Sequence, residues 1–373
     1  MSREEVGYWV AFNRIPTIGR ARFALLEGHF GSMERAWRAS SDELVAAGLD
    51  QRSVRSLVTR RSTISPDAEM ERLARQGIDA FTIHDPGYPR LLREIYEYPP
   101  VLYVKGELEP DDERAVTIVG TRKTTAYGRE VAHQIAWDLA KNGVTVVSGL
   151  ARGIDGTAHR AALDAGGRTV AVLASGLDTI YPPEHSNMAR EIARNGALVS
   201  EHPPGVRPEA KNFPRRNRLL SGLTPGTLVV EAGEGSGALW TVRHATDQNR
   251  EVMAVPGSIL SPASRESNRL IQDGAKMVLG YADVLEELNF SALGQQMELR
   301  QVLPQDNREI QLLTWITYEP VHIDEIQRAS GLPVAAVSSS LTMMEIRGLV
   351  KQVGGMNYVR TREAPALYET APA

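Results

Sequence analysis

Six short runs of apolar and β-branched residues between positions 114 and 290 constrain the fold more than any other feature of the chain. Each run is followed by a glycine-bearing turn, and stretches with helical spacing of apolar residues separate the runs. The runs span residues 116–119, 144–148, 169–173, 197–200, 227–231 and 252–255. Because they are apolar along almost their whole length, they predict an α/β fold: an extended Rossmann-like parallel sheet with helices on both faces.

The segments on either side of this region predict two further domains. Residues 1–64 are Arg-rich and helical in pattern, with a Gly19 turn typical of a small helix-hairpin-helix or SAM-like domain. Turn amides in such a unit can face a phosphate, although a simple packing module fits the pattern equally well. The remaining boundaries that we expect are 65–290 for the Rossmann-like domain, 291–307 for a linker, 308–362 for a C-terminal winged helix and 363–373 for a tail.

Composition excludes several classes of function. The 373 residues include no cysteine, and the eight histidines are scattered singly, so disulfides, thiolate zinc sites and a metal centre are not expected. The dinucleotide fingerprint and the P-loop motif are missing, so no cofactor is expected. The sequence shows neither a secretory leader nor a long apolar stretch, which predicts a cytoplasmic protein without membrane contact. With a net charge of −4, any nucleic-acid site must be a local basic patch.

Glycine-bearing loops follow three of the predicted strands. In an open α/β sheet the carboxyl ends of the strands form the ligand crevice, and glycine there lets backbone amides approach an anion. A single such loop is also the ordinary solution for a tight turn, but three in one sheet indicate an anion site. The loop residues singled out as amide or phosphate contacts are Gly120, Ser148, Gly149, Gly153, Ser236 and Gly237.

The run at 211–218 is the most informative for function, since it holds four cations, one aromatic ring and no acid. Cations that track phosphates, together with rings and guanidinium planes on which bases stack, are what a single-strand site requires. Pro214 and Asn217 favour a shaped loop here rather than a helix face. The alternative is that the arginines are solvated or paired with Glu231 and Glu234. The residues expected to bind DNA, which include two cations after the first strand, are Gly120, Arg122, Lys123, Gly149, Gly153, Lys211, Asn212, Phe213, Arg215, Asn217 and Arg218.

Several of these motifs, in this order and spacing, resemble the DprA family of DNA-processing proteins. The resemblance covers roughly residues 80–360 and is most specific over 116–277. It rests on the sequences at 118–122, 148–159, 181–182, 200–201, 213–218, 230–237 and 256–257.

The resemblance implies a homodimer, formed through the Rossmann-like domain, that binds single-stranded DNA and loads a RecA-type recombinase during transformation and competence. Carried over by position, Arg122 would clamp a base, the three glycines would offer amides to phosphates, and Lys211, Arg215 and Arg218 would neutralise phosphates. Phe213 and Asn217 would meet bases. The candidates for the dimer face are Leu270 and Ile271.

Two departures from the family pattern are visible. Glu266 stands where the family usually has glycine, and His185 stands where asparagine is common. Neither lies in the basic run, so they bear on the dimer or the rim of the site rather than on DNA binding.

Three interpretations therefore stay open. The first is a non-enzymatic single-strand binder, with weak duplex contact through the N- or C-terminal domain at most, since the expected reading helix 334–347 offers only Ser, Thr and one Arg. The second is an enzyme resembling nucleotide phosphoribohydrolases, with Glu231 acting near a ribose. The third is an adaptor whose arginines meet an acidic protein patch. The sequence favours the first.

Overall fold

The computed structural model describes residues 2–290, 307–317, 319–346 and 349–360. Its contacts divide the chain after Leu288 into two compact units, which are described separately below. Apart from Asn307, the expected linker at 291–307 lies outside the described residues, as does the expected tail at 363–373.

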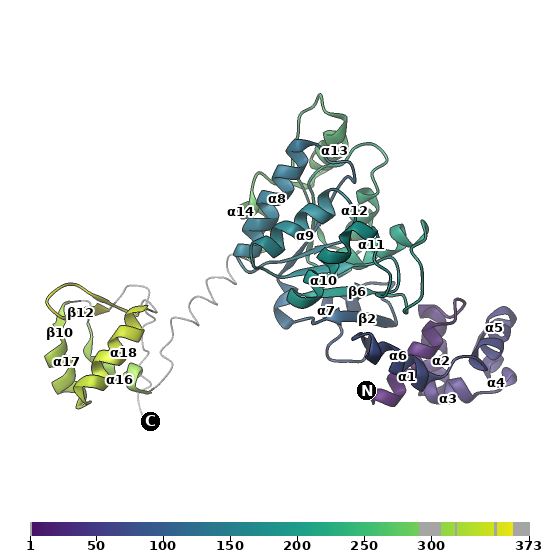
Figure 1. The fold of residues 1–373 in the computed structure, drawn as a ribbon, viewed down its shortest axis with the longest axis horizontal. Coiled ribbons are helices and arrows are strands. Elements are labelled where there is room, and N and C mark those ends of the chain that lie inside the picture. Colours follow the sequence, from purple (N-terminus) through teal and green to yellow (C-terminus); the bar gives the residue numbers. More distant parts are fainter. Residues whose placement is uncertain (1, 291–306, 318, 347–348, 361–373) are drawn as a thin grey trace. The chain divides into compact units, whose positions relative to one another are not determined.

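A β-sheet lies among the helices of the first unit (Figure 1). It has nine strands in the order β1-β2-β6-β5-β4-β3-β7-β8-β9. The strands from β6 to β9 run parallel, whereas β2 pairs antiparallel with both β1 and β6. The expected parallel sheet is confirmed, and β1, β2 and β9 lie outside the six runs from which it was predicted. The bounds are β1 Asp79–Thr82, β2 Val101–Gly106, β3 Ala115–Val119, β4 Thr145–Ser148, β5 Thr169–Val172, β6 Ala197–Ser200, β7 Gly226–Val229, β8 Glu251–Ala254 and β9 Lys276–Met277.

The strand order reverses at β3. Strands β4, β5 and β6 extend from one side of it, and β7 and β8 extend from the other. The loops that leave β3 and β7 therefore diverge, and a crevice opens between them at the carboxyl edge of the sheet.

Helices cover both faces of the sheet, as expected. On one face α11 and α12 supply Leu219, Leu220 and Val242 to a cluster with the strands. On the other face α10 supplies Ala189 and Ile192. The helices of this region are α7 Arg90–Glu94, α8 Ala126–Lys141, α9 Ile154–Asp164, α10 Ser186–Asn195, α11 Asn212–Gly222, α12 Ala238–Asp247, α13 Arg265–Gln272 and α14 Tyr281–Glu287, and the short 3₁₀ turns are Pro110–Glu113, Pro183–His185 and Pro262–Ser264.

The N-terminal helices share one hydrophobic cluster with this sheet. Trp9, Phe12 and Phe23 from the helices belong to the same buried cluster as Tyr103 of β2 and Leu198 of β6. The Tyr103 hydroxyl also donates a hydrogen bond of 2.9 Å to Asn13 Oδ1. The helices are α1 Arg3–Asn13, α2 Arg20–Phe30, α3 Met33–Arg38, α4 Ser41–Ala46, α5 Gln51–Arg61 and α6 Pro66–Arg75.

The described residues of the second unit form three helices, a hydrophobic core and a three-stranded sheet in the order β10-β12-β11. This is the expected winged helix, in which β11 and β12 form the hairpin. The bounds are α16 Asn307–Trp315, β10 Val321–His322, α17 Ile323–Ser330, α18 Val334–Ile346, β11 Val350–Gln352 and β12 Asn357–Arg360. In the part of the chain that the structure describes, every helix is too short or too polar to cross a bilayer.

Candidate functional site

A pocket of about 660 Å³ opens where the strand order reverses, between the loops after β3 and β7 and the start of α11. We call it the strand-end pocket. Its walls combine basic, aromatic and small residues, which suits an anionic ligand that also carries flat rings. The lining includes Gly120, Arg122, Lys123, Ala151, Asp155, Tyr181, Phe213, Pro214, Arg216, Asn217, Ser236, Gly237 and Trp240.

The run at 211–218 is helical, so the expected loop is wrong. Helix α11 begins at Asn212 and includes Phe213 and Pro214 in its first turn. The amides of a first turn have no acceptor within the helix, so a proline there removes no hydrogen bond. Asn217 is tolerated further along because its Nδ2 donates to Gly237 O at 3.2 Å.

Helix α11 divides the predicted DNA contacts between its two sides. Phe213 and Asn217 line the strand-end pocket. Lys211, Asn212, Arg215 and Arg218 instead line a second hollow, on the side of the N-terminal helices. The structure therefore brings only part of the predicted set together with the loop after β3.

Arg122 and Phe213 meet in the strand-end pocket. The Arg122 guanidinium carbon lies 5.3 Å from the centre of the Phe213 ring, within the range of a cation–π contact. Tyr181 meets Phe213 edge to face, with ring centres 5.7 Å apart. Arg122 and the neighbouring Lys123 are exposed, so both cations remain accessible to a ligand.

Arg216 forms the floor of the pocket. Its guanidinium donates to the carbonyl oxygens of Gly149 and Val172, and its Nε donates to Asn217 Oδ1 at 3.2 Å. Burial lowers the pKa of Arg216 to about 10, against the opposing effect of nearby Asp155. The arginine therefore stays charged at neutral pH and supplies a fixed positive charge under the pocket.

Asp155 balances this charge from the first turn of α9. Its carboxylate accepts hydrogen bonds from the amides of Gly149 at 3.2 Å and Ala151 at 3.3 Å. Burial raises its pKa, while Arg216 and the two amides act in the opposite direction. Since the Gly149 amide is already bound to Asp155, the expectation that it faces a phosphate is not met.

The glycines at this edge allow close approaches. A Cβ at Gly120 would lie 2.8 Å from Glu231 O, and one at Gly149 would overlap the Arg216 guanidinium. Gly153 has φ +79° and lies against the backbone of Thr121 and Arg122. Gly120 lines the strand-end pocket, whereas Gly153 lines a separate hollow beside Arg122.

The predicted phosphate-loop residues separate into two groups. Ser148 is fully buried and its hydroxyl donates to Ile118 O at 2.6 Å, so its expected phosphate contact is wrong. Ser236 and Gly237 do line the strand-end pocket. The Ser236 Oγ accepts from the Ala238 amide at 3.4 Å, a long contact that a ligand can replace.

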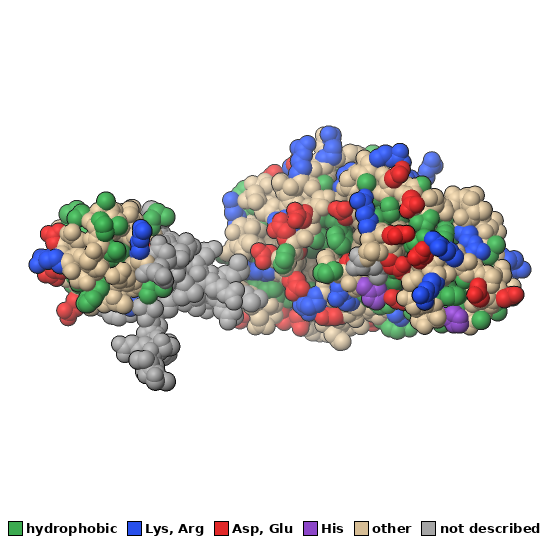
Figure 2. All heavy atoms as spheres, turned by 90° about the horizontal axis from the view of Figure 1, so that it is seen from below, with side chains coloured by type: hydrophobic (Ala, Val, Ile, Leu, Met, Phe, Trp, Pro, Cys, Tyr) green, Lys and Arg blue, Asp and Glu red, His purple; other side chains and the backbone are tan. Residues whose placement is uncertain are grey.

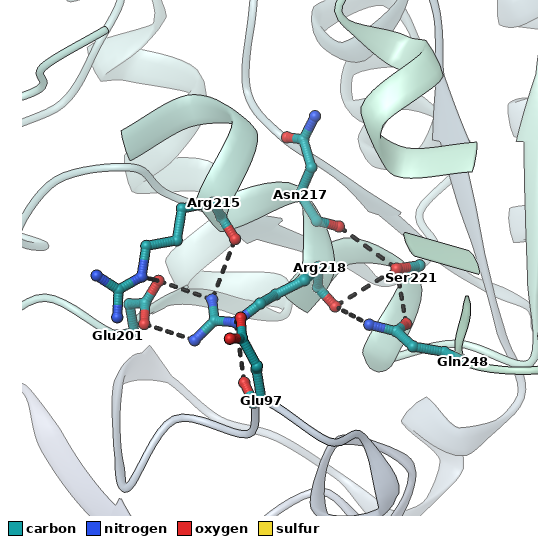
Figure 3. Close-up of polar contacts among 7 residues, drawn as sticks. All are labelled: Glu97, Glu201, Arg215, Asn217, Arg218, Ser221 and Gln248. Carbon is teal, nitrogen blue, oxygen red and sulfur yellow. Dashed lines mark hydrogen bonds and ion pairs between the residues drawn. The ribbon is translucent and has the colours of Figure 1, made fainter. Parts of the chain in front are cut away.

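Arg218 is part of the core rather than a free cation. Its guanidinium donates to both oxygens of Glu201, at 2.8 and 2.7 Å, and both side chains are at least 93% buried (Figure 3). Burial alone would raise the pKa of Glu201, but the adjacent Arg218 outweighs it and the pKa is lowered. The expected role of Arg218 in neutralising phosphate is therefore not met.

The other residues of the basic run differ in side-chain exposure and in their ion-pair and hydrogen-bond partners. The Arg215 side chain is 60% exposed, and its Nε lies 3.7 Å from the Glu201 carboxylate. Asn217 points away from this ion-pair cluster (Figure 3). Lys211 is exposed and pairs with Glu209 at 2.7 Å, whereas Asn212 is buried and donates to Ala174 O at 3.3 Å. Arg215 and Arg218 thus pair with Glu201 rather than with Glu231 or Glu234, the two partners that the alternative interpretation named.

Glu231 is unsuited to the enzymatic alternative. It is 1% exposed, and its carboxylate accepts from the Thr125 amide at 3.0 Å and the Thr125 hydroxyl at 2.6 Å. His159 is also fully buried, with Nδ1 2.7 Å from Thr169 Oγ1, and burial lowers its pKa to about 3. Within the described residues no group of three or more His, Asp or Glu side chains is arranged to hold a metal.

The structure also shows where the two departures from the family pattern and the two candidates for the dimer face lie. His185 Nδ1 lies 2.9 Å from Leu150 O, and Glu266 lies in the first turn of α13 with its amide on Ala232 O. Leu270 and Ile271 are partly buried against the cluster beneath α11 and α12.

Several residues that line the strand-end pocket were not among the predicted contacts, and those with a charged or large aromatic side chain are Asp155, Tyr181, Arg216 and Trp240. Arg216 belongs to the basic run, but the sequence does not show that its side chain is buried while that of Arg215 is exposed. Tyr181 directly precedes a proline, which indicates a turn but does not indicate that the Tyr181 ring contacts Phe213. Acidic and basic side chains are interspersed on the face shown in Figure 2, so charge of one sign does not dominate that face.

Comparisons with known proteins match both units. A family model described as DNA recombination-mediator protein A matches residues 79–289, more than half of the chain. A second, the DprA winged helix domain, matches residues 300–356. Protein Smf of Synechocystis is 34% identical, over 96% of this chain and 100% of that protein.

Two solved structures are similar to this chain over more than half of its length. DNA processing protein A of Streptococcus pneumoniae matches with a TM-score of 0.66 and 33% identity, over 77% of this chain and 98% of that one. The protein of the same name from Helicobacter pylori, described for its single-stranded DNA binding mode, matches with a TM-score of 0.52 and 28% identity, over 57% and 96%. The chain therefore belongs to the DprA/Smf family of DNA recombination-mediator proteins.

Proposed function

We propose that the strand-end pocket binds single-stranded DNA without a chemical reaction, and that the protein passes the strand to a RecA-type recombinase. The observation that carries this proposal is the contact of Arg122 with Phe213, 5.3 Å apart at the switch point of the sheet. A splayed base can stack on this pair while its phosphates meet Arg122 and Lys123. The single-strand binding described for the Helicobacter pylori relative supports the same assignment.

Single-strand specificity follows from the shape of the site. The aromatic rings of Phe213 and Tyr181 lie within the pocket, so only a base that has left its stack can reach them. Every base has an aromatic face, so little sequence preference is expected. The fixed charge of Arg216 lies too deep for a duplex backbone to approach, because this side chain is only 4% exposed.

The test is fluorescence anisotropy with labelled oligo-dT and the matching duplex. We expect Phe213→Ala and Arg122→Ala to weaken single-strand binding about five- to hundredfold, the range for one lost base stack. Arg194→Ala is the matched control, since Arg194 is an exposed arginine of α10 outside the pocket. Wild-type binding to the duplex as tight as to the single strand would contradict the proposal.

Homodimer formation and recombinase loading belong to the same proposal. Leu270 and Ile271 lie on α13, and the strongly exposed Ile259, Leu260 and Leu279 flank this helix in sequence. Sedimentation of wild type and of Leu260→Ser tests the dimer. Recombinase loading is tested by RecA ATPase on single strands covered with a single-strand binding protein, where wild type should shorten the lag and Arg122→Ala should not.

A further inference from the structure

A second hollow of about 1100 Å³ lies on the other side of α11, between the N-terminal helices and the first strands of the sheet. We call it the N-terminal groove. It is formed by the turn before α2, the segment 96–100 and the segment 201–212. Seven Arg or Lys side chains and three Glu side chains line it. Asp50 and Glu69 pair with two of these cations from outside the lining, and positive charge still remains in excess. A chain with a net charge of −4 concentrates cations here against its overall balance.

The groove presents an aromatic platform as well as charge. The Arg20 guanidinium carbon lies 4.6 Å from the ring centre of Tyr96 and 5.0 Å from that of Tyr98. Tyr96 is 81% exposed, so most of this ring faces solvent rather than protein. Stacked guanidinium and phenol groups of this kind bind nucleobases in single-strand sites.

Some of the cations remain available to a ligand. Five of the seven pair with carboxylates: Arg14 with Glu69, Arg22 with Asp50, Lys211 with Glu209, and Arg215 and Arg218 with Glu201. The side chains of Lys211 and Arg215 are exposed, so a phosphate can replace the carboxylate at either one. Arg20 and Arg52, by contrast, have no acidic partner within the described part of the chain. Within the described residues the Arg20 guanidinium contacts the two tyrosine rings and no carboxylate, so the protein does not neutralise its charge.

Helix α11 connects this groove with the strand-end pocket. Phe213 and Asn217 line the pocket on one side, and Lys211 and Arg215 line the groove on the other. Lys211 and Arg215 are both exposed at the start of the helix. A strand with one base against Phe213 can therefore pass over these two cations and enter the groove.

We infer that the N-terminal groove is a second segment of the single-strand path, in which Arg20 and Tyr96 stack a base and the neighbouring arginines contact phosphates. The inference rests on the proposed function, since it extends the strand bound in the strand-end pocket. An acidic protein segment is the competing occupant. It would use the arginines but would leave the exposed Tyr96 ring without a flat partner, so the aromatic platform favours nucleic acid.

The experiment measures how affinity depends on strand length in the full-length protein. Labelled oligo-dT of about 6 nucleotides fills one site, and lengths up to about 20 nucleotides reach the second. We expect Arg20→Ala/Tyr96→Ala to bind the short strand as wild type does, and to lose about tenfold or more in affinity for the long strand. Arg60→Ala/Tyr127→Ala is the matched control, since both residues are exposed and lie outside the groove.

A second readout locates the strand directly. Long oligo-dT carrying one 5-iodouracil is irradiated and the cross-linked peptide is identified. Cross-links to Tyr96 or Tyr98, at substituted positions removed from those that cross-link to Phe213, support the inference. A labelled poly-glutamate peptide tests the competing occupant in parallel.

Each outcome separates this inference from the proposed function. If Arg20→Ala/Tyr96→Ala binds strands of every length like wild type, the groove is not part of the path, while the strand-end pocket stands. Loss of poly-glutamate binding without loss of DNA binding overturns the inference in favour of an acidic protein partner. If wild type binds no oligonucleotide at all, the proposed function and this inference both fail.

Discussion

Arg218 and Glu201 form a two-point ion pair beneath α11, with side chains that are only 5% and 7% exposed. Removing one partner of such a pair leaves the other charge buried and uncompensated. We expect Arg218→Ala to lower the free energy of unfolding by about 3–5 kcal/mol, measured by urea denaturation. Arg215→Ala is the control on the same helix, because Arg215 is 60% exposed and its removal should cost under about 1 kcal/mol. Equal losses for the two variants would mean that the pair does not stabilise the fold.

Arg122 is expected to set part of the salt dependence of DNA binding. Each phosphate contact releases counterions, with a slope of about −0.7 per contact in a plot of log affinity against log salt for single strands. Arg122→Ala should therefore make the slope about 0.7 shallower, measured by anisotropy from about 50 to about 200 mM salt. Arg194→Ala should leave the slope unchanged. A parallel shift of the whole line for Arg122→Ala would indicate stacking without a phosphate contact.

Gly153 is expected to be far less tolerant of alanine than Gly166. Both have positive φ, +79° and +72°, a backbone conformation that disfavours any residue with a Cβ. Only Gly153 also lies against the backbone of Thr121 and Arg122, whereas a Cβ at Gly166 meets nothing within 4 Å. Gly153→Ala should lose at least about 1–3 kcal/mol more than Gly166→Ala in thermal or urea unfolding, as expected when the backbone must shift. It should also weaken oligo-dT binding by displacing Arg122, and equal behaviour of the two variants would refute the steric argument.

His159 makes stability depend on pH in a defined direction. Its pKa is lowered to about 3 by burial, so between pH 6.5 and 3 the unfolded chain binds a proton that the folded chain does not. The contribution is fully present above pH 6.5 and is lost by about 1.4 kcal/mol for each unit as pH falls through this range. His159→Gln should therefore show a shallower fall in unfolding free energy between pH 6.5 and 4.5. His29→Gln, at an exposed position, should keep the wild-type slope, and an unchanged slope in His159→Gln would argue against burial of a neutral imidazole.

The core strands of the sheet were predictable because strands buried on both faces consist almost entirely of apolar residues. Strand β3, for example, is buried at all five positions and reads as a continuous apolar run. Strand β1 was missed because Asp79–Thr82 lies at the edge of the sheet, where one buried residue suffices and no apolar pattern is needed. Strand β9 has only two residues, too few for any periodicity.

The candidate site was predicted in composition but not in arrangement. The basic run at 211–218 does supply Phe213 and Asn217 to the strand-end pocket. Its cations take three different roles, because a helix turns successive side chains by about 100°. Arg215 faces solvent, Arg216 faces the strand ends and Arg218 faces Glu201. The prediction of a loop from Pro214 was wrong because proline is compatible with the first turn of a helix. Whether Pro214 lies in a first turn depends on where the helix begins, which the sequence did not show.

The cluster that joins Trp9 and Phe12 to Tyr103 and Leu198 makes the N-terminal helices structurally inseparable from the sheet. A truncated chain that begins after residue 64 would place the side chain of Tyr103, now fully buried, in contact with water. Such a shortened protein would expose a hydrophobic patch and would tend to self-associate. A version of this chain without the amino-terminal helices would therefore need polar substitutions, or another covering element, on this face of the sheet.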